Sequence, residues 1–378
     1  MNINQAKDKV QREVLNAWWK TGRKGTAECA TAFGKTRVGV MAAGYMASQC
    51  DYTCKILIIT PTTAIQDEWR GEFKKWGETK TLKECVQIEC INTARTFINE
   101  QYSLVIADEI HNYILGDINS AFFRNNTYTS ILGLSATIED NLMERLNTIA
   151  PICYSLDLYQ AVELGLVSDF TIYNLKVKLS KTERAEYDRL SGIISFTWEK
   201  YSRQSWGNIS KRKNILYSAK AKMKALEKII NIFDKDSHGI IFSMTKDHSN
   251  EVKKVFKDKC LAHHSGITKK TRINNLNKFA DGRSKIKLLS SAKTLDEGVT
   301  LPRLEYGVIM SNSSKSKQQN QRAGRCIRLG KKGKHAVIVR LYCEDTQEEK
   351  WLETSQSKLK VITVNSIAEL KKLITKTK

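Results

Sequence analysis

Leu104-Val105-Ile106-Ala107-Asp108-Glu109-Ile110-His111 is the stretch that decides the fold of this chain. Four apolar residues in a row predict a strand that is covered on both faces, and such strands are typical of parallel sheets. The strand ends in two carboxylates, and ligands of open parallel sheets bind at the carboxyl ends of the strands. The stretch therefore predicts an α/β fold with an acidic ligand site at one edge of the sheet.

Short apolar runs of this kind recur along the whole chain, and most of them end in polar residues. They lie at 56–59, 104–107 and 131–134 in the first half, and at 239–242, 286–289, 306–310 and 336–339 in the second. Helical segments alternate with these runs, which is the pattern of parallel strands joined by crossover helices. We therefore expect two similar α/β units in tandem, each a mostly parallel sheet flanked by helices, over residues 1–168 and 169–378.

The segment between the two sets of runs, about residues 151–235, predicts a crossover and two helices, with the helical part at about 180–235. Ser180-Lys181-Thr182-Glu183 is a capping box, which opens the first helix by satisfying its free backbone N–H groups. Leu226, Ile229, Ile230 and Phe233 form an apolar stripe on the second helix. We expect both helices to belong to the second unit.

The composition is that of a globular protein with room for two cores. The chain has 378 residues, of which 41% are hydrophobic and only three are proline, and this favours two ordered domains over disorder. No window of 18 consecutive apolar residues occurs and the N-terminus is polar, so we expect no membrane span and no secretory signal. The expected location is the cytoplasm.

Nine cysteines are scattered through the expected strands and helices. The closest pairs, Cys50/Cys54 and Cys85/Cys90, lack the spacing of a zinc site and have no histidine nearby to complete four ligands. Reduced thiols are therefore favoured over a metal site or a disulfide framework, as in a reducing compartment.

The net charge of +22 is confined to one half of the chain. Residues 1–200 carry 23 Lys and Arg against 24 Asp and Glu, whereas residues 201–378 carry 39 against 16. A Lys-rich solvated surface is one explanation of such an excess. A one-sided excess of this size is more typical of a polyanion partner, and nucleic acid is the favoured one.

Ala30-Thr31-Ala32-Phe33-Gly34-Lys35-Thr36 predicts a phosphate-binding loop before a helix that begins near Arg37. Backbone amides of such a loop cradle phosphates at the helix N-terminus, its lysine neutralises the β- and γ-phosphates, and its threonine can ligate magnesium. Cys29 stands where the phosphate-loop pattern has its first glycine. The Gly-Lys-Thr is therefore a degenerate match that does not decide the function alone.

Asp108 and Glu109 supply the chemistry that such a loop needs. A carboxylate at the end of a strand suits a magnesium ion, and an adjacent carboxylate suits a base that polarises the attacking water. An acidic turn after a strand is the alternative without function. The order of the two motifs, with Asp108 73 residues after Lys35, favours a nucleotide site.

Gln321-Arg322-Ala323-Gly324-Arg325-Cys326-Ile327-Arg328 is an arginine cluster far downstream of the phosphate loop. Its spacing puts several guanidinium groups on one surface, which suggests a second domain that completes the nucleotide site. A site divided between two domains opens and closes with each hydrolysis, and this is the design of a motor rather than of a simple ATPase.

Taken together and in order, these motifs resemble those of superfamily-two helicases with two RecA-like domains. The set includes Ser135-Ala136-Thr137, and Glu297-Gly298 before Leu301-Pro302. The segment from Pro151 to Val167 is similar to the crossing segment of the XPB-like, UvsW-like and restriction-enzyme-like branch. The compact length resembles a phage-type member, for which the cytoplasm would be that of the host. Ile110-His111 departs from the DEAD-box ending, which argues against a DEAD-box RNA helicase.

The resemblance implies an ATP site in the cleft between the two domains. Gln11 would read the adenine, Lys35 and Thr36 would bind phosphate and magnesium, Asp108 would hold the metal, and Glu109 would activate the water. Ser135 and Thr137 would couple the nucleotide state to domain closure. The second domain would add Gln321 at the γ-phosphate or water, the arginine fingers Arg325 and Arg328, and Glu297 and Gly298 beside the ribose.

The resemblance also implies nucleic-acid contacts that bind phosphates rather than base edges. The matching positions are Pro61, Thr62, Thr93 and Arg95 in the first domain, and Ser243, His264 and Ser291 in the second. Apart from this resemblance, Ser and Thr hydroxyl groups at strand ends favour a simpler role, namely capping of free backbone groups. Trp198, Tyr201 and Trp206 alternate with cations up to Lys213, a pattern that fits base stacking or helix packing.

The motifs together predict an ATP- and magnesium-dependent nucleic-acid translocase, with a DNA helicase as the leading hypothesis. An RNA helicase, or a translocase on double-stranded DNA that does not unwind it, stays open. A non-catalytic nucleic-acid-binding module is disfavoured by the intact Lys35, Asp108 and Glu109. We expect a monomer without membrane contact, whose specificity comes from a protein partner or from inserts.

Overall fold

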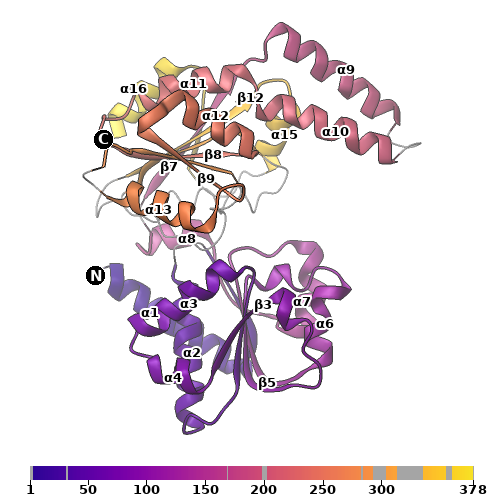
Figure 1. Cartoon of the computed structure of the whole chain (residues 1–378), viewed down its shortest axis with the longest axis vertical. Coiled ribbons are helices and arrows are strands. Elements are labelled where there is room, and N and C mark those ends of the chain that lie inside the picture. Colours follow the sequence, from indigo (N-terminus) through magenta and orange to yellow (C-terminus); the bar gives the residue numbers. More distant parts are fainter. Residues whose placement is uncertain are drawn as a thin grey trace. The chain divides into compact units, whose positions relative to one another are not determined.

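The protein forms two compact units, Met1–Val167 and Ser168–Lys378, and each has its own parallel sheet (Figure 1). The structure is a computed structural model, and it describes residues 3–30, 33–167, 169–197, 202–281, 284–292, 304–312, 335–354 and 360–377. The predicted α/β class with two helix-flanked parallel sheets is confirmed.

The first unit is built on six strands that lie in the order β3-β2-β4-β5-β1-β6. Every neighbouring pair is parallel, so all six strands end at the same edge of the sheet. The strands are β1 (Lys24–Cys29), β2 (Ile56–Thr60), β3 (Val86–Cys90), β4 (Gln101–Asp108), β5 (Thr127–Ser135) and β6 (Ile152–Leu156).

Helices cover both faces of this sheet, with α1 to α4 on one side and α6 and α7 on the other (Figure 1). The helix α2 contacts α1, α3, α4 and the strands β4 and β5, so it lies at the centre of its layer. The helices are α1 (Ile3–Lys20), α2 (Lys35–Gln49), α3 (Thr63–Lys75), α4 (Thr79–Glu84), α5 (Ile91–Ala94), α6 (Asp117–Asn125), α7 (Met143–Ile149) and α8 (Leu158–Glu163).

The second unit is built on seven strands in the order β13-β7-β12-β11-β8-β10-β9. They too are parallel throughout. The strands are β7 (Phe170–Val177), β8 (His238–Ser243), β9 (Cys260–His264), β10 (Leu288–Ala292), β11 (Leu304–Ile309), β12 (Ala336–Cys343) and β13 (Val361–Val364).

The helices of the second unit include a hairpin, α9 and α10, that extends away from the sheet (Figure 1). The predicted capping box opens α9, because Ser180 N donates to Glu183 Oε2 at 2.9 Å and Glu183 N donates to Ser180 Oγ at 3.3 Å. The helices are α9 (Lys181–Thr197), α10 (Ser202–Tyr217), α11 (Lys220–Ile230), α12 (Lys246–Phe256), α13 (Lys269–Ala280), α15 (Gln347–Thr354) and α16 (Ile367–Thr377).

One expectation about the elements needs correction: the segment 180–235 holds the three helices α9, α10 and α11 instead of two. The helix expected near Arg37 is α2, which begins at Lys35. The stripe on α11 does face the core: Leu226 and Ile229 are fully buried, and Phe233, just beyond the helix, stacks on Tyr306 with ring centroids 3.8 Å apart.

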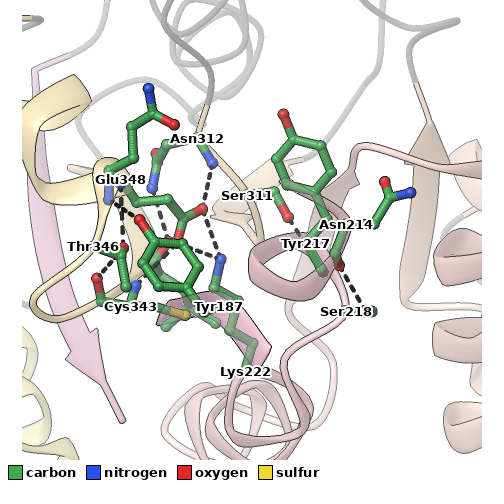
Figure 2. A network of polar contacts seen from close by, with 12 residues as sticks. Tyr187, Asn214, Tyr217, Ser218, Lys222, Ser311, Asn312, Cys343, Thr346 and Glu348 are labelled. Atoms are coloured by element: carbon green, nitrogen blue, oxygen red, sulfur yellow. Dashed lines mark hydrogen bonds and ion pairs between the residues drawn. The ribbon is translucent and has the colours of Figure 1, made fainter. Parts of the chain in front are cut away.

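A buried ion pair joins the helical and sheet layers of the second unit (Figure 2). Lys222 on α11 donates to both carboxylate oxygens of Glu348 on α15 at 2.8 Å, and both side chains are fully buried. The same carboxylate accepts the backbone N–H of Asn312 at 3.2 Å and of Cys343 at 2.9 Å. One carboxylate thus holds α11, the chain just after β11 and the end of β12 together.

All cysteines among the described residues are free thiols. Cys29, Cys54, Cys85, Cys90, Cys260 and Cys343 are buried, and Cys50 and Cys153 are partly buried. Burial raises the pKa of Cys29, Cys54, Cys260 and Cys343 to about 12. Within the same ranges, no helix has the length and apolar character needed to cross a membrane.

Candidate nucleotide site

The phosphate loop joins β1 to α2 at the carboxyl edge of the first sheet. Gly34 caps α2 with φ 97° and ψ 44°, a left-handed conformation that favours glycine. A Cβ at this position would lie 2.6 Å from Gln11 Nε2. Phe33 is fully buried, so its side chain belongs to the core, while Thr31 and Ala32 lie outside the described residues.

Lys35 and Thr36 lie in the first turn of α2. Lys35 Nζ donates to Cys29 O at 3.1 Å and so spans the loop from its helical end to its strand end. Thr36 is partly buried. Because the first N–H groups of a helix have no partner within it, this turn is suited to bind an anion.

Gln11, the predicted adenine reader, is buried and hydrogen-bonded to the loop itself. Its Nε2 donates to Phe33 O at 3.0 Å and to Gly34 O at 3.4 Å, and its Oε1 accepts from Arg37 Nη1 at 2.6 Å. Arg37 also pairs with Asp8 and lies over the Trp76 ring, 3.9 Å from its centroid. The described contacts of Gln11 therefore shape the phosphate loop.

Arg37 was not among the residues singled out from the sequence. The one feature of the sequence that could have marked Arg37 is its position directly after Gly34-Lys35-Thr36. Its partners Asp8 and Gln11 come from α1, 29 and 26 residues earlier, so no local pattern joins them.

Asp108 ends β4 and lies buried, with an exposed fraction of 9%. Burial raises its pKa to about 7, and the neighbouring Glu109 carboxylate adds to the rise, whereas the Trp69 N–H and the Lys35 ammonium lower it. Trp69 Nε1 donates to Asp108 Oδ2 at 3.0 Å. The site therefore holds a carboxylate that a nearby cation would stabilise.

Glu109 follows in a left-handed conformation, with φ 55° and ψ 50°. Such a conformation is uncommon for a residue with a Cβ and costs free energy, so it persists only where the surrounding structure imposes it. The turn sends the chain into a short 3₁₀ helix, Ile110–Asn112. Glu109 is thereby placed directly beside the end of β4.

His111 connects the acidic box to the next motif. Its Nδ1 lies 2.7 Å from Ser135 Oγ and 3.4 Å from Glu109 Oε2. Ser135 Oγ donates to Thr137 O at 3.1 Å. The predicted coupling residues Ser135 and Thr137 are thus linked to Glu109 through His111, a residue of the acidic motif to which the sequence assigned no role of its own.

The residues present fit a magnesium ion. Thr36 and Asp108 offer a hydroxyl and a carboxylate, the oxygen ligands that magnesium prefers, and this ion commonly takes its other ligands from water and nucleotide phosphates. A protein-only metal cage is a different kind of site. The described ranges contain no group of three or more His, Cys, Asp or Glu that could form one.

The predicted nucleic-acid contacts of the first unit lie at or near strand ends and differ in exposure. Thr62 is exposed at the N-cap position of α3, and Pro61 before it is half-buried. Thr93 is exposed on α5, and Arg95 is half-buried at the end of that helix. These four side chains stay predictions.

The predicted contacts of the second unit are more deeply placed. Ser243 and Ser291, on the neighbouring strands β8 and β10, are buried, and neither hydroxyl has a hydrogen-bond partner among the described residues. His264 is also buried, with Nε2 2.9 Å from Asn250 Oδ1 and Nδ1 accepting from Gly266 N at 3.2 Å. They too stay predictions.

Two of the cations that follow Trp206, Arg212 and Lys213, have partners within the second unit. Arg212 donates to Ser191 Oγ at 3.2 Å and to Gln347 Oε1 at 2.7 Å, and Lys213 Nζ lies 5.7 Å from the centroid of the Trp351 ring. Trp206 itself is 65% exposed, whereas Trp198 and Tyr201 lie outside the described residues. The same holds for Glu297, Gly298, Gln321, Arg325 and Arg328.

Comparisons with protein families match both units in turn. Residues 2–140 match the family described as type III restriction enzyme, res subunit. Residues 221–330 match the helicase conserved C-terminal domain. The comparison with curated protein sequences finds no match.

Solved structures with the same fold come from several organisms. Saccharomyces cerevisiae Dbp5 bound to RNA and ADP BeF3 aligns with 15% identity over 98% of this chain and 93% of its own, with a TM-score of 0.68. The Pyrococcus furiosus Hef helicase domain aligns with 16% identity over 92% of this chain and 98% of its own, at 0.54. An HsdR fragment of a type I restriction enzyme from Vibrio vulnificus aligns with 15% identity over 95% and 69%, at 0.63.

The two matched domains, in this order on two RecA-like folds, define a superfamily-two helicase, and the chain belongs to that class. It is therefore a helicase-type, ATP-dependent enzyme that acts on nucleic acid.

Proposed function

We propose that this protein is an ATP- and magnesium-dependent DNA helicase that couples hydrolysis to strand separation or remodelling. The observation that carries the proposal is the connection from Asp108 and Glu109 through His111 to Ser135, at the sheet edge that also bears the phosphate loop. A carboxylate pair linked in this way can pass a change at the nucleotide to the next motif.

In the first unit, each proposed role follows from the chemistry of the side chain. Lys35 neutralises phosphate charge, Thr36 and Asp108 hold magnesium, and Glu109 accepts a proton from the attacking water. Gln11 serves the adenine as well as the loop to which it is hydrogen-bonded. Bound magnesium supplies neutralisation of the charge on the phosphates.

In the second unit, the proposed roles rest on the sequence motifs. Arg325 and Arg328 stabilise the charge that develops on the transferring phosphoryl group, and Gln321 holds the γ-phosphate or the water. Glu297 and Gly298 line the ribose. These residues are proposed to act on the same nucleotide as the motifs of the first unit.

DNA is proposed over RNA because the first unit matches a restriction-enzyme family. The excess of positive charge in residues 201–378 supports a polyanion in either case. The strand is proposed to contact Pro61, Thr62, Thr93 and Arg95, together with Ser243, His264 and Ser291, through its phosphates. We further propose a cytoplasmic monomer whose specificity comes from a protein partner or from its inserts.

The deciding experiment compares ATP hydrolysis with single-stranded DNA, duplex DNA and RNA, and follows strand separation of a forked duplex. Stimulation by DNA together with unwinding is expected. Stimulation by RNA alone would identify an RNA helicase, and stimulation by duplex DNA without unwinding would identify a duplex translocase.

Variants of the motif residues test the site. Lys35→Ala and Glu109→Gln are expected to abolish turnover, because one removes the phosphate cation and the other the base. Arg325→Ala is expected to retain ATP binding and lose turnover by about 10³-fold or more. Glu84→Gln is the control: it replaces an exposed carboxylate on α4 by a carboxamide, and it should leave the activity unchanged. Turnover that survives Lys35→Ala and Glu109→Gln would contradict the assignment.

A further inference from the structure

Trp69 is a buried residue outside the motifs, and its indole reaches the nucleotide site. It lies on α3, it has no exposed surface, and its Nε1 donates to Asp108 Oδ2 at 3.0 Å. Among the described residues, it is the hydrogen-bond donor to this carboxylate. A donor of this kind fixes the direction in which a metal-binding carboxylate presents its free oxygen.

The indole of Trp69 packs against Gly39 of α2, the helix that follows the phosphate loop. A Cβ at Gly39 of α2 would lie 2.4 Å from Trp69 Cη2 and 2.9 Å from Cζ3. Gly39 is in mid-helix, where glycine is less favourable than alanine. The indole therefore packs directly on the backbone of α2, and this close approach depends on the glycine.

The helix that carries Trp69 begins at the proposed nucleic-acid contact. Thr62 is exposed at its N-cap position, and Pro61 precedes it. Ile65, Trp69 and Phe73 form its buried stripe, so α3 is packed along its length. A shift of α3 on binding a strand would move Nε1 on this helix relative to Oδ2 on β4.

We propose that Trp69 is the positioning residue that orients Asp108, and that it links occupancy of the nucleic-acid track at Pro61 and Thr62 to the nucleotide site. This inference rests on the proposed function. It would explain how nucleic acid stimulates ATP hydrolysis. A bound strand would shift α3, and the hydrogen bond from Trp69 would then change the orientation of Asp108.

The test is Trp69→Phe, which keeps an aromatic ring beside Gly39 and removes the indole N–H. The magnesium concentration needed for half-maximal binding of fluorescent mant-ATP should rise about 10- to 100-fold. Stimulation of turnover by oligo(dT) should fall by a similar factor. Affinity for oligo(dT) without nucleotide should be unchanged, because Trp69 has no exposed surface with which to touch a strand.

Trp18→Phe is the matched control. Trp18 is equally buried in the same unit, and its Nε1 donates to Ile131 O at 2.8 Å, away from Asp108. The control loses a comparable buried hydrogen bond, so it reveals effects of stability alone. Gly39→Ala is a second variant, which displaces the indole and should reproduce the Trp69→Phe phenotype.

Identical magnesium dependence and stimulation in Trp69→Phe and Trp18→Phe would overturn the inference. A raised magnesium requirement with unchanged stimulation would overturn the link to the track. Failure of the proposed function has a different signature, namely a wild-type protein that oligo(dT) does not stimulate. The mant-ATP measurement tests the orientation of Asp108 even then.

Discussion

Gly34 is the residue on which the shape of the phosphate loop depends. Its φ of 97° lies where an L side chain is strained, and Gln11 Nε2 occupies the space that a Cβ would need. Gln11 cannot move aside freely, because its amide is bonded to Phe33 O and Arg37. The small side chain of alanine is therefore already too large.

We expect Gly34→Ala to weaken ATP binding. A left-handed conformation costs a non-glycine residue about 1–2 kcal/mol, and relief of that strain would distort the loop that presents Lys35. The affinity for mant-ATP should fall by about fivefold to thirtyfold.

Gly71→Ala is the control for this prediction. Gly71 lies on α3 without a positive φ, and a Cβ there would meet no heavy atom within 4 Å, so the exchange should leave the affinity unchanged. Equal affinity in Gly34→Ala and wild type would show that the loop tolerates a side chain at its turn.

At the scale of elements, the Glu348 carboxylate holds α11 and two strand ends in one place. Removing one partner of a buried ion pair leaves an uncompensated charge, which costs about 3–5 kcal/mol. We expect Lys222→Met to lower the free energy of unfolding of the full chain in urea by this amount.

The double variant Lys222→Met/Glu348→Gln should recover part of the loss, because no buried charge remains. The backbone N–H groups of Asn312 and Cys343 bond to different oxygens of Glu348, so the single amide oxygen of glutamine can accept from only one of them. Equal stability of the single and double variants would show that the charge of Glu348 is not what destabilises Lys222→Met.

The strands that the sequence predicted and those that it missed differ in their place in the sheet. β2, β4 and β5 are interior strands of apolar residues, and their runs were recognised. β3, β6, β9 and β13 are edge strands, which need less apolar surface and give a weaker pattern. Two missed strands, β1 and β7, are interior. They read Lys-Gly-Thr-Ala-Glu-Cys and Phe-Thr-Ile-Tyr-Asn-Leu-Lys-Val, and neither contains four apolar residues in a row.

The candidate site shows the same division. Gly34, Lys35, Asp108 and Glu109 stand in recognisable local patterns. Trp69 contacts Asp108 across 39 residues of sequence, and nothing near Trp69 in the chain marks it as more than a core residue. Contacts between layers of the fold are set by packing, which one sequence does not display.

At the scale of the whole molecule, charge is divided between the two units. Residues 1–167 carry 17 Lys and Arg against 19 Asp and Glu, and residues 168–378 carry 45 against 21. Binding of a polyanion should therefore depend on the second unit for most of its electrostatic attraction.

We expect affinity for oligo(dT) to fall steeply with salt, because each phosphate that is neutralised releases counterions, with a slope of about 0.7 per phosphate on a logarithmic plot. Titrations between about 50 and 200 mM salt would measure the slope. Binding of mant-ATP alone over the same range is the internal reference. A flat response of oligo(dT) binding would contradict a phosphate-directed track.

Both units contain buried cysteine thiols whose reactivity reports local unfolding of the unit in which they lie. Cys29, Cys54 and Cys90 lie in the first unit and Cys260 and Cys343 in the second, all buried, and a thiol reacts as its thiolate only where reagent can reach it. Their alkylation must therefore await local unfolding. Mass spectrometry of the alkylated peptides would give the rate at which each buried cysteine reacts. These rates report local unfolding of the first and the second unit separately.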